Sequence, residues 1–266
     1  EESTIAQRLV RAKRTLREMR IPFEVPDAEG LPARLDSVLE VLYLLFNEGY
    51  SAHSGAELVR QDLCAEAIRL TSVLVQHPAG DVPRVHALLA LMTLQASRLP
   101  ARTDDDGNIL LLRKQDRSLW DRTLINIGLI ELARSATGDT ISEYHIQAGI
   151  ASIHALAQSY EETQWMAILK QYDLLMKVAP SPVVALNRSV ALAMVDGPYA
   201  GLKDLERVRA MQGIEGYYLF YATLGEFRTQ VGDRAGAIVA YRNALDLATT
   251  VPEQRFLQGK LDSLQQ

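Results

Sequence analysis

Small and aromatic residues recur at fixed intervals in one stretch of this chain, FYATLGEFRTQVGDRAGAIVAYRNALDLA, residues 220–248. Two helices can pack closely only where small side chains stand at their crossing, and Gly225, Ala237 and Ala244 have the spacing for it. Gly232 lies between the two halves and permits a tight turn. The stretch therefore predicts a pair of antiparallel helices.

These spacings are typical of a tetratricopeptide (TPR) unit, in which aromatic side chains such as Tyr221 fill the wedge between successive helix pairs. The upstream stretch WMAILKQYDLLMKVAP repeats the second half of the unit, with Tyr172 at the aromatic position. Gly197 precedes Gly232 by 35 residues, close to one repeat length. We interpret residues 165–249 as about two and a half TPR-like units. Ordinary antiparallel helix hairpins, which also have glycine turns, are the alternative.

The rest of the chain has helical periodicity interrupted by proline and glycine. IPFEVPDAEGLP, residues 21–32, ends a first helix and forms a connector, and Gly49 is the expected C-cap of the next helix. TDDDGNILLL is the one irregular stretch, a short extended excursion before a helix that begins near Asp116. We expect helices over residues 3–20, 35–50, 57–77, 82–100, 119–135, 142–158, 163–178, 182–195, 200–211, 215–231, 234–249 and 251–264.

No segment alternates polar and apolar residues with period two over a useful length, so no sheet is predicted. The predicted fold class is all-α: a TPR-like helical repeat, a right-handed α-solenoid, preceded by a helical bundle. Residues 34–137 are assigned to the helical domain and residues 138–266 to the TPR-like repeats with a C-terminal capping helix. Residues 1–22 form a separate first segment, joined by a linker over residues 23–33.

Composition excludes several classes of protein. Hydrophobic residues make up 48% of the chain, which supports a core and argues against disorder. The single cysteine, Cys64, excludes an internal disulfide framework, and its place inside a predicted helix indicates a buried structural thiol. No apolar run reaches the roughly 18 residues of a membrane span, so we expect no membrane contact and a cytoplasmic protein. Residues 1–20 carry six basic and three acidic side chains in a chain of net charge −5, which sets this segment apart.

Common catalytic motifs are absent from the sequence. It contains no phosphate-binding glycine loop, no GxSxG and no HExxH. His145 and His154 stand nine residues apart on one predicted helix, a spacing that does not bring both to one metal ion. We therefore expect no enzyme activity, no cofactor and no metal site.

Two clusters of polar and aromatic residues stand in apolar surroundings. The first is Asn47, Glu48 and Tyr50, and the second is Asp116, Arg117 and Trp120. An Asp and an Arg beside a large aromatic side chain can line a ligand pocket. They can equally form helix termini with ion pairs, and the sequence leaves both interpretations open.

Longer phrases resemble a known family. LYLLFNEGYSAHSG, DLCAEAIRL, QDRSLWD and SPVVALNRSVALAMVDGPYAGL resemble the long C-terminal extension of one group of extracytoplasmic-function (ECF) sigma factors. STIAQRLVRAKRTL resembles the recognition helix of region 4 in those factors, which lies in the major groove of promoter DNA. The resemblance implies a detached recognition helix over residues 1–22, and binding of core RNA polymerase and promoter DNA by the full-length protein. By position, it implies DNA contacts by Thr4, Gln7, Arg8, Arg11 and Lys13.

The expected function is that of a regulatory, protein-interaction domain of an ECF sigma factor in transcription initiation. A TPR-like groove would bind a protein or peptide partner through Tyr172, Asn187, Arg188, Tyr218 and Tyr221. The alternative is a small-molecule sensor, in which the two polar clusters form a pocket that gates the sigma factor. A free-standing TPR adaptor is a third hypothesis. Because neither region 2 nor the first helices of region 4 stand before residue 1, we expect this chain alone to bind promoter DNA weakly or not at all.

Overall fold

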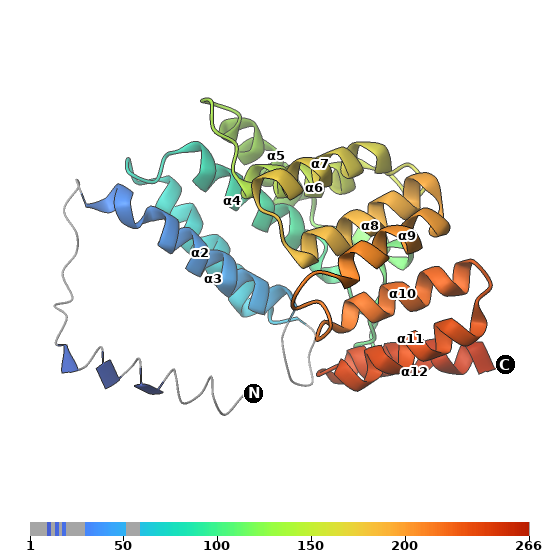
Figure 1. Ribbon diagram of the computed structural model, residues 1–266. Coiled ribbons are helices and arrows are strands. Elements are labelled where there is room, and N and C mark those ends of the chain that lie inside the picture. Colours follow the sequence, from blue (N-terminus) through green and yellow to red (C-terminus); the bar gives the residue numbers. More distant parts are fainter. Residues whose placement is uncertain (1–9, 12–13, 16–17, 20–29, 52–58, 266) are drawn as a thin grey trace. The chain divides into compact units, whose positions relative to one another are not determined.

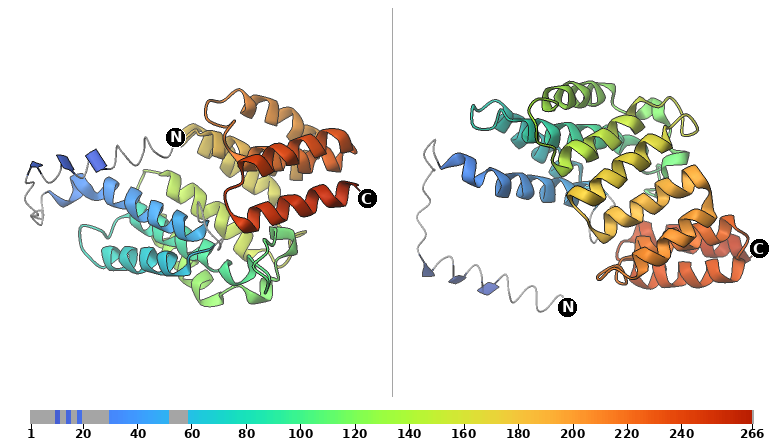
Figure 2. Two further views of the ribbon diagram at one scale, coloured as in Figure 1. Left: turned by 90° about the horizontal axis from the view of Figure 1, so that it is seen from below. Right: turned by 45° about the horizontal axis from the view of Figure 1, so that its top comes forward.

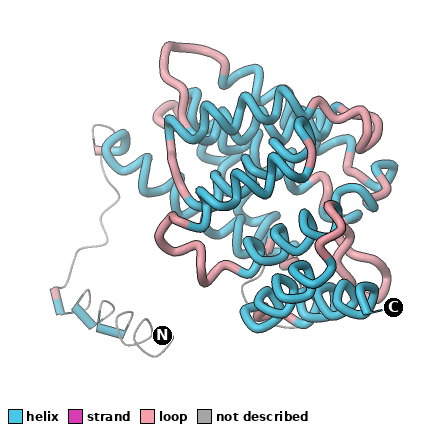
Figure 3. The backbone as a smooth tube through the Cα atoms, turned by 45° about the vertical axis from the view of Figure 1, so that its right-hand side comes forward, coloured by secondary structure: helices cyan, strands magenta, loops and turns pink. Residues whose placement is uncertain are grey.

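A computed structural model of the chain describes residues 10–11, 14–15, 18–19, 30–51 and 59–265. The regular structure of these residues is helical, and strand-like pairing is limited to one isolated antiparallel bridge between Thr103 and Ile109. Figure 3 accordingly shows helices joined by loops. The all-α class predicted from the sequence is confirmed for this part of the chain.

The helices are labelled in Figure 1. Their bounds are α2 Leu31–Tyr50, α3 Gln61–Val75, α4 Pro83–Ala96, α5 Arg122–Ser135, α6 Glu143–Leu156, α7 Trp165–Val178, α8 Pro182–Asp196, α9 Pro198–Arg209, α10 Tyr218–Gln230, α11 Arg234–Leu247 and α12 Val251–Gln265. Short 3-10 helices cover Leu99–Ala101, Leu112–Lys114 and Arg117–Leu119.

Local sequence explains where these helices begin. Pro83, Pro182 and Pro198 each stand at the start of a helix, where the missing N–H costs no hydrogen bond. The Ser181 hydroxyl accepts a hydrogen bond from the Val184 N–H at 3.1 Å and caps α8. Such signals place most predicted helix boundaries within a few residues of the observed ones.

The chain divides into two compact units, Glu1–Asp36 and Ser37–Gln266. In the first unit, residues 10–11, 14–15 and 18 are helical, and Arg14 forms an ion pair with Glu18 at 2.6 Å. Arg11 is exposed there. The other predicted DNA-contacting residues, Thr4, Gln7, Arg8 and Lys13, lie outside the described residues.

In the second unit, each helix from α7 to α12 packs against the next (Figures 1 and 2). The predicted crossing of α10 and α11 is confirmed: a Cβ added at Gly225 would lie 2.9 Å from the Tyr241 ring, and Ala237 and Ala244 are fully buried. Gly232 turns the chain between these helices with φ +81°, a conformation that favours glycine. Successive helix hairpins therefore form this part of the molecule.

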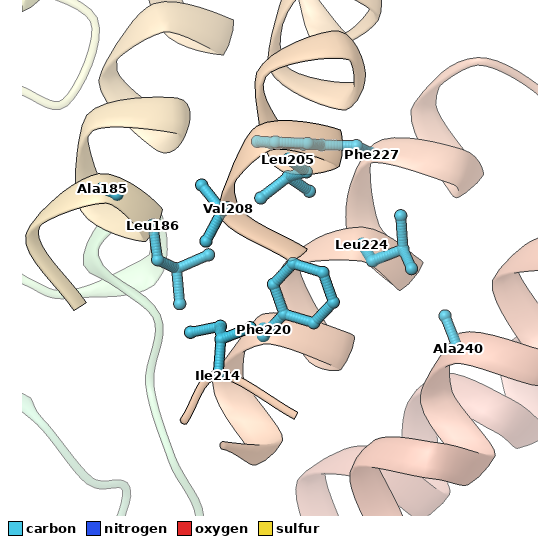
Figure 4. Packing of buried hydrophobic residues seen from close by; sticks show 9 residues of the cluster. All are labelled: Ala185, Leu186, Leu205, Val208, Ile214, Phe220, Leu224, Phe227 and Ala240. Carbon is cyan, nitrogen blue, oxygen red and sulfur yellow. The ribbon is translucent and has the colours of Figure 1, made fainter. Parts of the chain in front are cut away.

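Two apolar clusters hold these hairpins together. One joins α8, α9 and α10 around Leu205 and Phe220, and its side chains converge from these helices in Figure 4. The other joins α11 to α12, where Leu257 and Leu261 cover Tyr241. Helix α12 thus covers one side of α11.

Two predicted features are corrected by the structure. Gly49 is not a C-cap but lies inside α2, where an added Cβ would be 2.7 Å from the Cys64 backbone nitrogen. Gly49 thus allows a close approach of the chain at Cys64, whose thiol is buried as predicted. The helix expected over residues 119–135 begins only at Arg122, because Asp121 caps it by accepting hydrogen bonds from the N–H groups of residues 123 and 124.

Candidate functional site

One cavity of the second unit has a volume of about 680 Å³. Its walls come from α2, α6, α7, α8, α10 and α12, with Gln95 of α4, Leu247 of α11 and the loop residue Arg98. The polar side chains in its wall are Tyr43, Asn47, Tyr50, Ser51, Gln95, Arg98, Gln147, His154, Tyr172, Asn187, Tyr217, Tyr218, Thr249 and Glu253. Amide groups and phenol rings dominate this lining.

The cavity combines residues from both predicted sites. Asn47 and Tyr50 belong to the first polar cluster, whereas Tyr172, Asn187 and Tyr218 belong to the predicted partner-binding surface. Exposed Val183, Asn187 and Leu219 mark the open side of the cavity, on α8 and α10. We call this part, defined by Val183, Asn187 and Leu219, the rim.

Phenol groups along the wall are held neutral. The Tyr43 hydroxyl donates a hydrogen bond to the Gln147 side-chain oxygen at 2.8 Å, and its ring packs edge-on against Tyr144. Burial raises the pKa of Tyr43, and burial raises the pKa of Tyr172 to about 12. Both hydroxyls therefore remain hydrogen-bond donors at neutral pH.

Three arginines gather beside this wall. Arg98 lines the cavity and lies 5.2 Å above the Trp120 ring, while Arg117 lies 4.7 Å from the same ring. Arg102 lies 3.9 Å from the Tyr50 ring and donates to the Tyr50 carbonyl oxygen. Their hydrogen bonds go to amide, hydroxyl and carbonyl oxygens, and among the described residues none of the three forms an ion pair with a carboxylate.

The positive field of these arginines acts on neighbouring titratable groups. Burial acts to raise the pKa of Tyr50, but the charges of Arg98 and Arg102 outweigh it and lower that pKa. Burial, followed by the charges of Arg98 and Arg117, lowers the pKa of His154 to about 3, so this imidazole is neutral at physiological pH. Its Nδ1 is buried and has no hydrogen-bond partner in the described structure.

Glu253 is the one carboxylate among the lining residues described. It is buried and accepts hydrogen bonds from the backbone N–H groups of Thr249 and Thr250 at 3.3 and 3.1 Å. The Thr250 hydroxyl accepts from the Glu253 N–H in return, which completes a capping box for α12. Burial and the Glu253 charge raise the pKa of Tyr218. The Glu253 carboxylate therefore caps the N-terminal end of α12.

The other predicted site residues lie outside the cavity wall. Arg188 bridges three helices through Asp173 at 2.7 Å and Asp204 at 2.9 Å. Tyr221 packs into the apolar clusters, edge-on to Phe220. Glu48, on α2, does not line the cavity.

Residues of the second polar cluster mainly cap the ends of helices. The Asp116 carboxylate accepts a hydrogen bond from the Ser118 N–H at 2.8 Å and caps the 3-10 helix that follows. Arg117 donates to the carbonyl oxygens of His154 and Ala157 at 2.6 and 2.7 Å, at the C-terminal end of α6. Trp120 is buried between the guanidinium groups. Its interpretation as helix termini is confirmed for Asp116, although Arg117 bonds to carbonyl groups instead of pairing with a carboxylate.

Arg98, Gln147, His154 and Glu253 line the cavity but were not among the predicted site residues. Arg98 follows an almost wholly apolar helix in the sequence, where a lone arginine carries no motif. Only Glu253 had a local signal, the Thr-x-x-Glu spacing of a capping box. The other positions come together through tertiary packing alone.

A second buried polar group lies between α4 and α5. The ring nitrogens of His86 lie 2.5 Å from a Glu131 carboxylate oxygen and 2.8 Å from an Asp81 oxygen. Arg134 donates to the other Glu131 oxygen at 2.8 Å. Each charge in this group is paired, so its geometry indicates a structural role.

The sequence predicts neither a metal site nor a membrane span. The described residues contain no group of three His, Cys, Asp or Glu side chains that could hold a metal ion. His145 bonds to the Ser142 hydroxyl and to the Ser135 carbonyl, and His154 packs edge-on against Trp165. In this same part of the chain, no helix combines the length and apolar character needed to cross a bilayer.

The chain is similar to a family of unknown function and to an uncharacterised bacterial protein. Residues 34–136 match DUF6596, a family of unknown function. The chain is 40% identical over 263 residues to the uncharacterised protein R00370 of Rhizobium meliloti (strain 1021). The match covers 99% of this chain but only 62% of that relative, so the chain spans less than two thirds of its length. No solved structure matches.

Proposed function

We propose that this chain is the C-terminal regulatory part of an ECF sigma factor and that it acts in transcription initiation by binding other proteins. The full-length protein would bind core RNA polymerase and promoter DNA. The phrases shared with the extension of ECF sigma factors support this proposal. A TPR-like stacking of the helix hairpins is part of the same proposal.

The observation that carries the protein-binding role is the cavity and its rim. Tyr172, Asn187 and Tyr218 come from three different helices and face one concave site. Exposed apolar side chains, Val183 and Leu219, stand beside Asn187 at the rim. A concave site with an apolar edge and convergent polar groups suits a helix or an extended segment of a partner.

A pull-down of core RNA polymerase and isolated sigma domains with the full 266-residue chain, in low and high salt, tests this proposal. We expect retention that Asn187→Arg abolishes, because a long charged side chain at the rim would block docking. Asn126→Arg, at an exposed position of α5, a helix that contributes no residue to the cavity wall, is the matched control and should leave retention unchanged. Failure to retain either partner in both salts would contradict the proposal.

A second candidate function is small-molecule sensing, in which an occupied cavity changes how the rim presents itself to a partner. The observation that favours it is the polar interior, where Tyr50 stands near Arg98 and Arg102. A cavity of about 680 Å³ also lies within the range of small-ligand sites.

A further inference from the structure

We propose that the cavity binds a small molecule with an anionic group, a carboxylate or a phosphate, and that Arg98 contacts this group. The inference deepens the sensing function and rests on the cavity being a ligand site. It does not depend on the link to transcription, which the pull-down tests separately.

Unused hydrogen-bonding capacity at Arg98 is the first argument. Its Nε and one terminal nitrogen both donate to a single oxygen of Gln115, each at 3.3 Å. A guanidinium group carries five N–H donors in a planar fork that fits a carboxylate or phosphate in a bidentate manner. In the described structure Arg98 has no acidic partner, although it stands in a cavity wall. An anion entering the cavity would supply one.

The balance of charge around the cavity is the second argument. Arg102 packs on the Tyr50 ring and Arg117 packs on the Trp120 ring, and both lie close to Arg98. Among the described residues, these two arginines likewise hydrogen-bond only to uncharged groups. On the acidic side stand Glu253, one oxygen of which accepts from two backbone N–H groups, and Glu161, whose single charge acts on Arg117. The net field at this wall is therefore positive, and it favours a negatively charged ligand.

The remaining wall fits an uncharged, flat body attached to the anion. Asn47, Gln147 and Asn187 offer amide donors and acceptors, and the rings of Tyr43 and Tyr172 offer apolar faces. The volume of about 680 Å³ lies within the range of small-molecule sites. We therefore infer a small aromatic or amide-bearing acid as the ligand class.

The chain carries its own reporters for a binding test. Its two tryptophans both adjoin the site: Trp120 lies under Arg98, and Trp165 packs 5.3 Å from His154, a lining residue. Titration of the full chain with benzoate and with phenyl phosphate, followed by tryptophan fluorescence, measures anion binding. Benzamide, which has the shape of benzoate without its charge, is the control probe.

We expect saturable binding of both anions, weaker at high salt, with benzamide binding at least about tenfold more weakly. Arg98→Gln should weaken benzoate binding about tenfold or more, and Arg98→Lys should restore part of it. Arg122→Gln, the same change at an exposed position of α5, should have no effect. Circular dichroism of each variant checks that it is folded.

Two results would overturn the inference. One is no saturable binding of either anion. The other is equal binding of benzoate and benzamide by the unaltered chain, a comparison that needs no variant.

Discussion

At the scale of single residues, glycine sets how closely the helices can approach. Gly201 lies where α8, α9 and α10 meet: an added Cβ would be 2.7 Å from the Ala193 Cβ and 2.6 Å from the Phe227 ring. The sequence predicted this role for Gly225 because the TPR-like spacing marks it. It gave no such signal for Gly201, whose neighbours are brought there by packing between helices distant in sequence.

We predict that Gly201→Ala lowers the free energy of unfolding by about 1–3 kcal/mol, because the added methyl group has no room where the three helices meet. Urea denaturation followed by circular dichroism measures the change. Gly259→Ala is the matched control: its Cβ would meet nothing within 4 Å on α12, and the substitution should stabilise by about 0.5–1 kcal/mol. Equal effects of the two substitutions would contradict the tight crossing.

The titration of His154 provides a second prediction at this scale. Burial and the neighbouring arginines lower its folded-state pKa to about 3 from an ordinary 6.5. Between these values the unfolded chain binds a proton that the folded chain does not, so this contribution to stability is complete above pH 6.5 and is lost as the pH falls. The free energy of unfolding should fall by up to about 1.4 kcal/mol per pH unit in this window.

His154→Gln removes this group and should flatten the dependence, as measured by urea midpoints from pH 7 to about pH 5. The corresponding change at an exposed position, His77→Gln, controls for loss of a histidine. An unchanged slope in His154→Gln would show that the neutral state of His154 does not contribute to the pH dependence of stability.

At the scale of helices, the sequence was most informative about where each one begins and ends. Prolines and capping residues act locally, so the helices from α6 to α12 could be predicted within about three residues. Gly49 was misinterpreted because a glycine near a helix end resembles a C-cap, whereas its actual role depends on Cys64 of α3. The cavity was predicted only in part, since its wall depends on how several helices come together.

The end of α6 depends on Arg117, which donates to two carbonyl groups that the helix leaves without partners. We predict that Arg117→Ala lowers the free energy of unfolding by about 2–4 kcal/mol, because both acceptors lose a charged donor. Thermal unfolding of this variant beside Arg122→Ala, an exposed control, measures the effect. A loss no greater than that of the control would mean that water replaces the guanidinium.

At the scale of the whole molecule, Ser37–Gln266 form one compact unit. Contacts cross the predicted boundary between residues 137 and 138: α4 packs on α6, and Tyr43 bonds to Gln147. We therefore expect a single calorimetric transition for this unit, with equal calorimetric and van't Hoff enthalpies. Two resolved transitions would instead support the predicted division into a helical domain and a separate repeat domain.

We propose that the rim of the cavity contacts the transcription machinery. Hydrogen–deuterium exchange of the full chain, with and without core RNA polymerase and the isolated sigma domains, locates any contact along the sequence. We predict slower exchange in peptides from α8 and α10, which carry Asn187, Tyr218 and Leu219, and unchanged exchange in exposed parts of α5. Unchanged exchange throughout the chain, at polymerase concentrations that saturate known sigma factors, would contradict this contact.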